Sequence, residues 1–430
     1  MTAEQGAATE TLTRKGRVST AQFALLLLTV VYVANFANRT ALYVLLPDIQ
    51  AEFKLADWQV GLLGGTAFAV FYTMAGLPIA RIADRGRRVT IICVCMALWS
   101  TMTMACGLTA SAFQLLLARV GVAVGEAGCT PAAHGMINRF FSADRRATAL
   151  GVYAAGSSAG AFLGLYVGGL VAAEYGWRAA FLIIGAPGVL IAAFVGLSLR
   201  EPPPRQEVES APTGTLMEIL KLLGSRPTFR WVVVAAAFAA LAGDGVSVWT
   251  PTLLNRSHGV SIAEAGRWMA FAQLIAGCGG MALGGYLSDR AARRGVKWRL
   301  WTPGLVMLAG APFALGVLYL DTPTGIVTCL FATTFATTFF AGPTFSAVHS
   351  LVGSRMRATA TALVLVIVTL IGTGLGPLVL GIASDLLRQA HGADSLRLSL
   401  LLAVASYLIS AFAFIRAGQH LERDARSAPL

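Results

Sequence analysis

The sequence predicts an all-α membrane protein with twelve transmembrane helices in two pseudo-symmetric six-helix bundles. Of its 430 residues, 56% are hydrophobic and only 13% are charged, whereas about a quarter of a soluble domain is charged. Apolar stretches of about 20 residues, the length that crosses a hydrocarbon core of ~30 Å, recur from one end of the chain to the other. Short motifs also repeat between the two halves. We expect no separate soluble domain.

Hydropathy predicts the boundaries of the spans. They are 21–46, 58–80, 89–109, 111–138, 147–173, 179–198, 228–253, 262–287, 301–320, 323–350, 358–384 and 396–416. The longest polar stretch follows the sixth span and contains EPPPRQEVESAPTG, whose prolines and charges indicate an aqueous linker. We therefore expect an N-terminal bundle over 1–199, a linker over 200–227 and a C-terminal bundle over 228–430.

The distribution of basic residues predicts the orientation in the membrane. If both termini are cytoplasmic, most of the 33 lysines and arginines lie on the cytoplasmic side, as the positive-inside rule requires. The outer loops then hold only Lys54, Arg178, Arg256, Arg267, Arg388 and Arg397. This bias accounts for the net charge of +12 without a nucleic-acid partner. The excess of arginine over lysine and the short loops suggest a bacterial inner membrane, and we expect a monomer.

Three pairs of motifs indicate an internal duplication. RIADRGRR after the second span corresponds to YLSDRAARRG after the eighth, which pairs Asp84 with Asp289. LLPDI and TPTLL close the first and seventh spans and pair Pro47 with Pro251. RATA opens both the fifth and the eleventh span. Carriers built from two such repeats place the substrate site between the halves, near the bilayer midplane.

Three charged residues lie inside predicted spans of the first half: Arg39, Arg119 and Glu126. An arginine keeps its proton, so each must face a carboxylate, backbone carbonyls or a wet cavity. Arg119 and Glu126 are two helical turns apart and share one face. Burial favours the neutral form of Glu126 and the arginines favour its ionised form, so its protonation could change with conformation or ligand. A static ion pair between two helices is the alternative.

The chain resembles the major facilitator superfamily. The resemblance rests on RIADRGRR, its echo YLSDRAARRG and the segment GWRAAFLI before the sixth span. It implies that these two loops latch the bundles together in one conformation. The gating residues it implies are Asp84, Arg85, Arg87, Arg88, Asp289 and Arg290. A mere signal for membrane topology is the alternative role of these loops.

RVGVAVGEAG in the fourth span, together with NRTALYVLLPDI in the first, resembles the spinster subfamily of proton-coupled lysolipid and sphingolipid carriers. This resemblance implies that Arg39 and Arg119 bind a headgroup and that Glu126 couples transport to protons. It also implies an Asp before Arg39, where this chain has Asn38. Either the chain uses Glu126 alone, or Asn38 is a charge-neutralised replacement of that Asp.

Other polar residues in the spans have weaker assignments. Asp244 is the candidate partner in the second half, facing either the cavity or its outer mouth. His134 and His349 lie near span ends, where we expect hydrogen bonding rather than proton relay. The four-residue glycine ladder of the fifth span, which runs from Gly156 to Gly168, favours close helix packing.

No enzyme motif, metal site or cofactor site is predicted. The six cysteines lie in apolar runs without metal-ligand spacing, and we expect small buried side chains: Cys93, Cys95, Cys106, Cys129, Cys278 and Cys329. Nucleotide-binding and nucleophile motifs are missing, which argues against an ATP-driven pump.

We therefore expect a proton-coupled secondary transporter of a lysolipid or sphingolipid-like substrate, acting by alternating access. The first alternative is a proton-coupled exporter of small amphipathic drugs or organic anions. The second is a receptor or scramblase of the same shape, without a coupled cycle.

Overall fold

The structure is a computed structural model that describes residues 3–84, 86–201, 216–353 and 356–426. These residues form helices and short connections, with no strand among them. They contain ten helical segments long and apolar enough to cross a membrane. Two of the segments, Thr148–Ser198 with 51 residues and Thr359–Arg426 with 68, are each long enough for two crossings. The prediction of twelve transmembrane helices is confirmed.

Each of the two long segments contains the turn that separates its crossings. Gly176 interrupts the first with a φ of 80° and a ψ of 165°, and Gly392 interrupts the second with a φ of 53°. Positive φ favours glycine because it has no Cβ. The chain therefore reverses direction at both points.

The elements of the first half are α1 (Ala3–Phe53), α2 (Asp57–Gly61), η1 (Leu62–Thr66), α3 (Ala67–Asp84), α4 (Arg88–Gly107), α5 (Ala112–Ala127), α6 (Cys129–Phe140) and α7 (Ala143–Ser198). A short helix, α8 (Leu216–Ser225), precedes the second half. Most of the predicted linker, 202–215, lies outside the described residues, and α8 occupies part of what was expected to be linker.

The elements of the second half are α9 (Pro227–Ala240), η2 (Leu241–Gly245), α10 (Val246–His258), α11 (Ile262–Phe271), η3 (Ala272–Gly277), α12 (Cys278–Ala292), α13 (Trp298–Tyr319), α14 (Pro323–Phe339), α15 (Ala341–His349), α16 (Arg357–Val368), η5 (Thr369–Leu375), α17 (Gly376–His391), η6 (Gly392–Asp394), α18 (Ser395–Ser399) and α19 (Leu401–Arg426).

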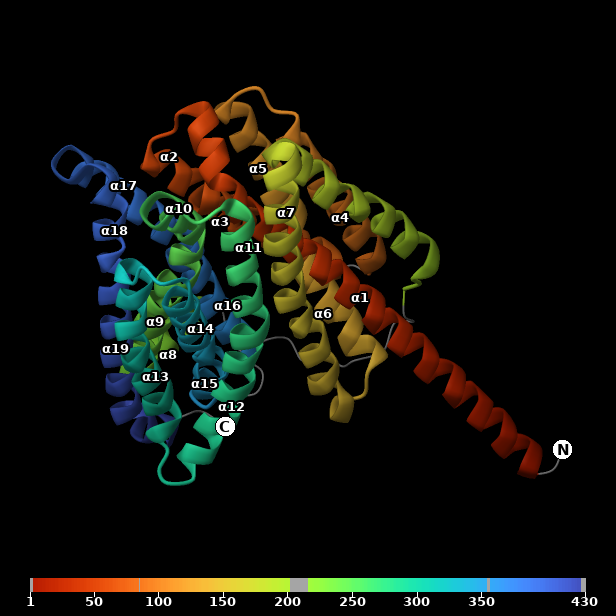
Figure 1. Cartoon of the computed structure of the whole chain (residues 1–430). Coiled ribbons are helices and arrows are strands. Elements are labelled where there is room, and N and C mark those ends of the chain that lie inside the picture. Colours follow the sequence, from red (N-terminus) through yellow and green to blue (C-terminus); the bar gives the residue numbers. More distant parts are fainter. Residues whose placement is uncertain (1–2, 85, 202–215, 354–355, 427–430) are drawn as a thin grey trace.

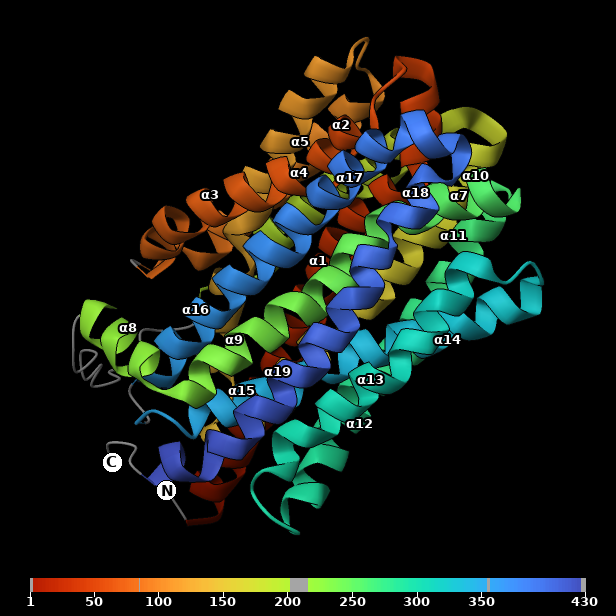
Figure 2. The ribbon, with the colours of Figure 1, turned by 90° about the vertical axis from the view of Figure 1, so that its left-hand side faces the viewer.

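The two halves meet at one end of the molecule. The helices α2, α10 and α17 gather there, and we call it the joined end (Figure 1). Toward the opposite end, where both chain termini lie, α6 and α7 diverge from α12 (Figure 1). Figure 2 shows the same separation of α2, α10 and α17 from the termini.

Glycines bring the long helices into close contact. A Cβ on Gly160 or Gly164 of α7 would collide with the backbone carbonyl of Val33 or Ala37 on α1. The glycine ladder thus lets the two backbones touch, the role predicted for it. Gly169 of α7 and Gly266 of α11 make a similar approach between the two halves.

Short π-helical turns interrupt four of the described crossings, at η1, η2, η3 and η5. Such turns commonly occur at functional sites because they free backbone groups and bend the helix. At one of them Thr66 donates a hydrogen bond of 2.6 Å to the carbonyl of Gly374 in η5. A Cβ on Gly65 would collide with the carbonyl of Thr373. The second and eleventh crossings therefore pack backbone against backbone across the two halves.

Candidate functional site

An ion pair joins the first and fourth crossings. Arg39 of α1 donates to the Glu126 Oε2 atom of α5 from Nε at 3.1 Å and from Nη2 at 2.7 Å. The Glu126 side chain is fully buried, whereas 19% of the Arg39 side chain is exposed. Such a charge-assisted contact offsets part of the cost of burying both groups. The structure thus brings together two of the predicted site residues.

Aromatic rings surround the Arg39 guanidinium. Its carbon lies 4.5 Å from the ring centroid of Phe68, 5.0 Å from that of Phe36 and 5.3 Å from that of Tyr72. Ring faces attract cations, most strongly where water is excluded. Arg39 is therefore stabilised by the rings as well as by Glu126.

Arg119 lies deeper, behind the same aromatic ring. Only 1% of the residue is exposed, and its guanidinium carbon is 5.6 Å from the Phe68 centroid. Its Nε and Nη1 atoms have no hydrogen-bond partner among the described residues. Phe68 thus contacts both arginines. Of the two, only Arg39 also lines the cavity between the two halves.

Asn38 is buried, with 1% of the residue exposed. Its Nδ2 atom donates a hydrogen bond of 2.7 Å to the carbonyl of Ala34, one helical turn earlier. A carboxylate at this position could not donate that bond, whereas a protonated acid could. Asn38 is therefore fixed in the hydrogen-bonding role of a neutral acid.

A cavity of about 490 Å³ lies between the halves. Its described lining includes Arg39, Tyr43 and Tyr72 from the first half and Asp244 and Thr373 from the second. Asp244 accepts a hydrogen bond of 3.1 Å from the Thr373 hydroxyl. Arg39 and Asp244 are the charged groups of the described lining, and most of the remainder is apolar with several threonine hydroxyls. Of the two positions considered for Asp244, the structure places it in the cavity.

The two predicted gating loops are described in part. Arg85 and the side chain of Asp84 lie outside the described residues. Arg87 is exposed at the start of α4, and Arg88 is buried. A Cβ on Gly135 of α6 would collide with the Arg88 guanidinium, so the two lie in contact.

In the second loop, Asp289 forms an ion pair of 3.6 Å with Arg299, and Arg290 is exposed. These contacts stay within one half. The latch between halves that the resemblance implies for these loops remains a prediction.

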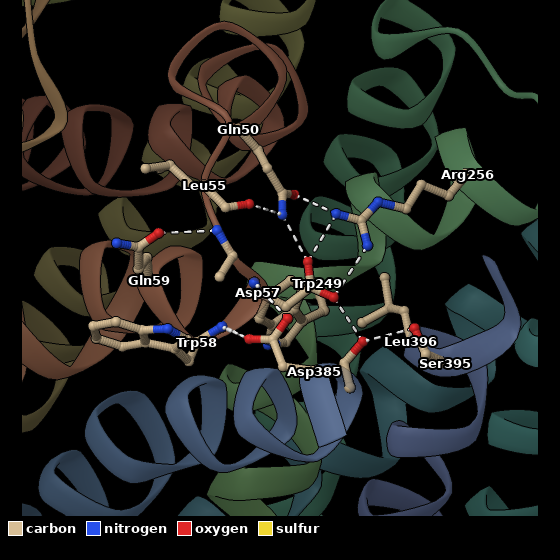
Figure 3. Close-up of polar contacts among 12 residues, drawn as sticks. Gln50, Leu55, Asp57, Trp58, Gln59, Trp249, Arg256, Asp385, Ser395 and Leu396 are labelled. Atoms are coloured by element: carbon tan, nitrogen blue, oxygen red, sulfur yellow. Dashed lines mark hydrogen bonds and ion pairs between the residues drawn. The ribbon is translucent and has the colours of Figure 1, made fainter. Parts of the chain in front are cut away.

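Sequence reasoning missed a second ion pair, at the joined end (Figure 3). Arg256 of α10 donates to both carboxylate oxygens of Asp57, at 2.8 and 3.2 Å, and to the side-chain oxygen of Gln50 at 2.5 Å. Asp57 is fully buried, and 27% of the Arg256 side chain is exposed. Ser384 of α17 donates a hydrogen bond of 2.6 Å to the same carboxylate. One carboxylate of the first half thus binds two helices of the second.

A carboxylate of the second half makes the reciprocal contact. Asp385 of α17 accepts from the backbone N–H groups of Asp57 and Trp58, at 3.1 and 2.8 Å (Figure 3). These groups begin α2, where unpaired N–H groups favour a negative charge. The signal in the sequence was an acid at the start of one span and an arginine at the end of another. Its pairing depended on the packing of the halves.

The histidines and cysteines have structural surroundings. His349 lies 2.7 Å from the Thr361 hydroxyl, and His134 packs edge-to-face on Tyr153. Four of the six cysteines are buried and two are half-buried. Within the described residues, no cluster of three His, Cys, Asp or Glu side chains could hold a metal ion.

Comparison with known proteins identifies the family. The sequence profile of the Major Facilitator Superfamily matches residues 28–377, most of the chain. The chain belongs to the major facilitator superfamily. This facilitator is 34% identical over 404 residues to an MFS-type efflux pump of Mycolicibacterium smegmatis, covering 92% of each chain. It is 26% identical to protein spinster homolog 1 of Xenopus laevis, covering 92% of this chain and 80% of that protein.

A solved structure supports the narrower resemblance. The facilitator superposes on a bacterial homologue of the human lysosomal transporter spinster, solved in an inward-facing and unoccupied conformation, with a TM-score of 0.86. The two sequences are 32% identical, and the match covers 94% of this chain and 98% of that one. The predicted family and spinster resemblance are confirmed, and the protein is a membrane transporter rather than an enzyme.

Proposed function

We propose that this facilitator is a proton-coupled carrier of an amphipathic, lipid-like substrate, of the lysolipid or sphingolipid class. The pairing of Arg39 with Glu126 is the observation that carries the proposal. Arg39 lines the cavity. Glu126 is buried behind Arg39 and binds its guanidinium on the side away from the cavity. Protonation of Glu126 removes the negative charge and releases Arg39 to bind an anionic group of the substrate.

The coupling must act in both directions. An anion bound to Arg39 weakens the hold of Arg39 on Glu126, and the carboxyl then takes up a proton more readily. Substrate and proton therefore favour each other's binding. Binding of an anionic substrate should be accompanied by proton uptake.

The cavity suits a substrate with two charges and an apolar tail. Arg39 can hold an anionic group, while Asp244 on the opposite half can pair with an amine. Threonine hydroxyls next to Asp244, such as Thr337 and Thr373, offer further hydrogen bonds. The apolar remainder of the lining favours an acyl chain.

The second candidate function is export of small amphipathic drugs or organic anions. The identity of 34% to a protein named as an efflux pump favours it. An exporter of cationic drugs would use Asp244 more than Arg39, whereas an exporter of organic anions would use Arg39. Substrate charge therefore distinguishes the candidates.

The expected orientation places both termini in the cytoplasm, in a bacterial inner membrane, with the protein acting as a monomer. The joined end is then the outer end. The cavity would face the cytoplasm, as in the inward-facing conformation of the structural relative. Opening the joined end would complete an alternating-access cycle.

Transport into proteoliposomes tests the proposal. The substrates are a lysophospholipid, a sphingoid amine, an organic anion and a cationic dye, each measured with and without a pH gradient. We expect concentrative, gradient-dependent transport of the lysolipid, and Asp244→Asn should reduce it more than transport of the organic anion. Gradient-dependent transport of the dye or organic anion alone would select the exporter. Transport unchanged without a gradient would favour the uncoupled scramblase.

A further inference from the structure

A second pocket lies at the joined end, apart from the central cavity. It has a volume of about 510 Å³, and both halves contribute to it. Three cationic side chains line it: Lys54 after α1, Arg256 on α10 and Arg388 on α17. The amides of Gln50 and Asn255 also line it, and its lining in the described part of the chain includes no carboxylate. Positive charge from both halves therefore converges on one pocket.

Two of the three cations have no balancing charge. Asp57 neutralises Arg256 from behind the pocket. Lys54 and Arg388 are exposed, and neither forms an ion pair with a carboxylate among the described residues. The two positive charges that remain come from opposite halves of the molecule. An anion between them would offset their mutual repulsion.

The backbone at Lys54 is unusual. Lys54 is the one described residue other than glycine with a positive φ, 53°. It follows the last residue of α1, and the next N–H, of Leu55, donates to the Gln50 carbonyl at 3.1 Å. Glycine normally occupies such a helix end, and a side chain there costs roughly 1 kcal/mol. The chain thus carries a lysine at a position where glycine would be less strained.

We propose that this pocket binds a phosphate group, either free or as the headgroup of an anionic lipid. The phosphate oxygens would bridge Lys54 of the first half to Arg388 and Arg256 of the second. Arginine and lysine together suit phosphate, which accepts several charge-assisted hydrogen bonds. Parting of the halves separates the cations, so the bound group stabilises the joined end closed. This pocket shares no lining residue with the central cavity that Arg39 lines.

Thermal unfolding of the purified full-length protein tests the site. In detergent, inorganic phosphate is titrated against chloride at equal ionic strength. In nanodiscs, phosphatidylcholine alone is compared with a mixture containing phosphatidylglycerol. The double variant Lys54→Gln/Arg388→Gln leaves the Asp57–Arg256 ion pair intact. Arg267→Gln is the matched control, because Arg267 is an exposed cation in the middle of α11, outside the pocket.

We expect the anion to raise the unfolding temperature of the wild type and of Arg267→Gln. In the double variant the half-saturating phosphate concentration should rise about tenfold or more. Stabilisation by phosphate in detergent identifies a site that accepts the free ion. Stabilisation confined to phosphatidylglycerol nanodiscs identifies a lipid headgroup site. Equal stabilisation of wild type and double variant under both conditions, or none in either, overturns the proposal.

The variant Lys54→Gly separates a loss of phosphate binding from a loss of folding stability. Glycine fits the positive φ without strain, so this variant should be at least as stable as the wild type without phosphate. It should nevertheless lose much of the stabilisation by the anion. Full retention of that stabilisation in Lys54→Gly would remove Lys54 from the site and refute the bridging arrangement.

Discussion

Arg39 and Glu126 are 87 residues apart in the sequence, and both hydrogen bonds between them end on one carboxylate oxygen, Oε2. The other oxygen, Oε1, is buried and has no hydrogen-bond partner among the described residues. A proton can therefore bind Oε1 without displacing either hydrogen bond from Arg39. Protonation removes the negative charge of Glu126 and thereby the ion pair with Arg39.

Glu126→Gln should abolish the response of transport to pH. The amide keeps the shape of the acid but carries no charge at any pH, so Arg39 is permanently released. Substrate binding should become independent of pH between 5 and 8 (about the physiological range), and proton uptake on binding should disappear. Transport in proteoliposomes across pH and proton uptake in weakly buffered solution measure these effects. Glu174→Gln, an exposed acid of α7, is the control and should behave as the wild type.

Asn38→Asp should make stability depend on pH. At low pH the neutral acid can donate to the Ala34 carbonyl as the amide does. As pH rises, the ionised form loses this bond and carries a buried charge, so stability falls by about 1–3 kcal/mol. The sign follows because the folded variant binds its proton more tightly than the unfolded chain does.

Chemical unfolding of Asn38→Asp and of the wild type, from acid to neutral pH, checks this expectation. Asn38→Ser is the control that cannot ionise, and its destabilisation should not vary with pH. If Asn38→Asp also restores a second pH-dependent step in transport, the chain is a charge-neutralised form of an Asp–Arg protein. If it does not, the chain relies on Glu126 alone.

Removing either partner of the Asp57–Arg256 pair should destabilise the joined end. Asp57→Asn and Arg256→Gln should each lower the free energy of unfolding by about 2–4 kcal/mol, because each removes the opposite charge from its partner and Asp57 is fully buried. The double variant should lose about 1–3 kcal/mol less than the sum of the single losses. Unfolding titrations of the four proteins measure the coupling. Asp321→Asn, an exposed acid, should have no effect, and strictly additive losses would contradict the pairing.

Gly65→Ala should destabilise the conformation in which the two halves meet at the joined end. Its Cβ would collide with the carbonyl of Thr373 on the opposite half, and backbone cannot yield as a flexible side chain can. The joined end should open more often, which labelling of an introduced cysteine near that end, in a cysteine-free background, would detect. Gly151→Ala adds a Cβ with nothing within 4 Å and is the matched control. An equal labelling rate in both variants would count against the close contact.

Much of the architecture was predictable because the bilayer constrains it strongly. In hydrocarbon every backbone polar group must be bonded within the chain, so an apolar run of about 20 residues can hardly form anything but a helix. The predicted spans, the glycine ladder of α7 and the duplication all follow from local pattern. The reciprocal contacts of Asp57 and Asp385 between α2 and α17 do not follow from local pattern, because they depend on how the halves pack.

The candidate site was predictable in its members and not in its arrangement. Arg39, Arg119 and Glu126 were identifiable because charges inside a span are costly. Their spacing placed Arg119 and Glu126 on one face of one helix, and an ion pair between two helices was among the alternatives. The structure pairs Glu126 of α5 with Arg39 of α1, while Arg119 lies against Phe68.

The sequence alone thus determined that this protein crosses a membrane twelve times and carries charges inside its first half. Both conclusions rest on local transfer free energies, which depend on residue type and spacing. Only the tertiary structure decided that Asp244 faces the same cavity as Arg39 and that Asp57 binds Arg256. Contacts between residues about 200 positions apart depend on helix packing, which no local pattern encodes.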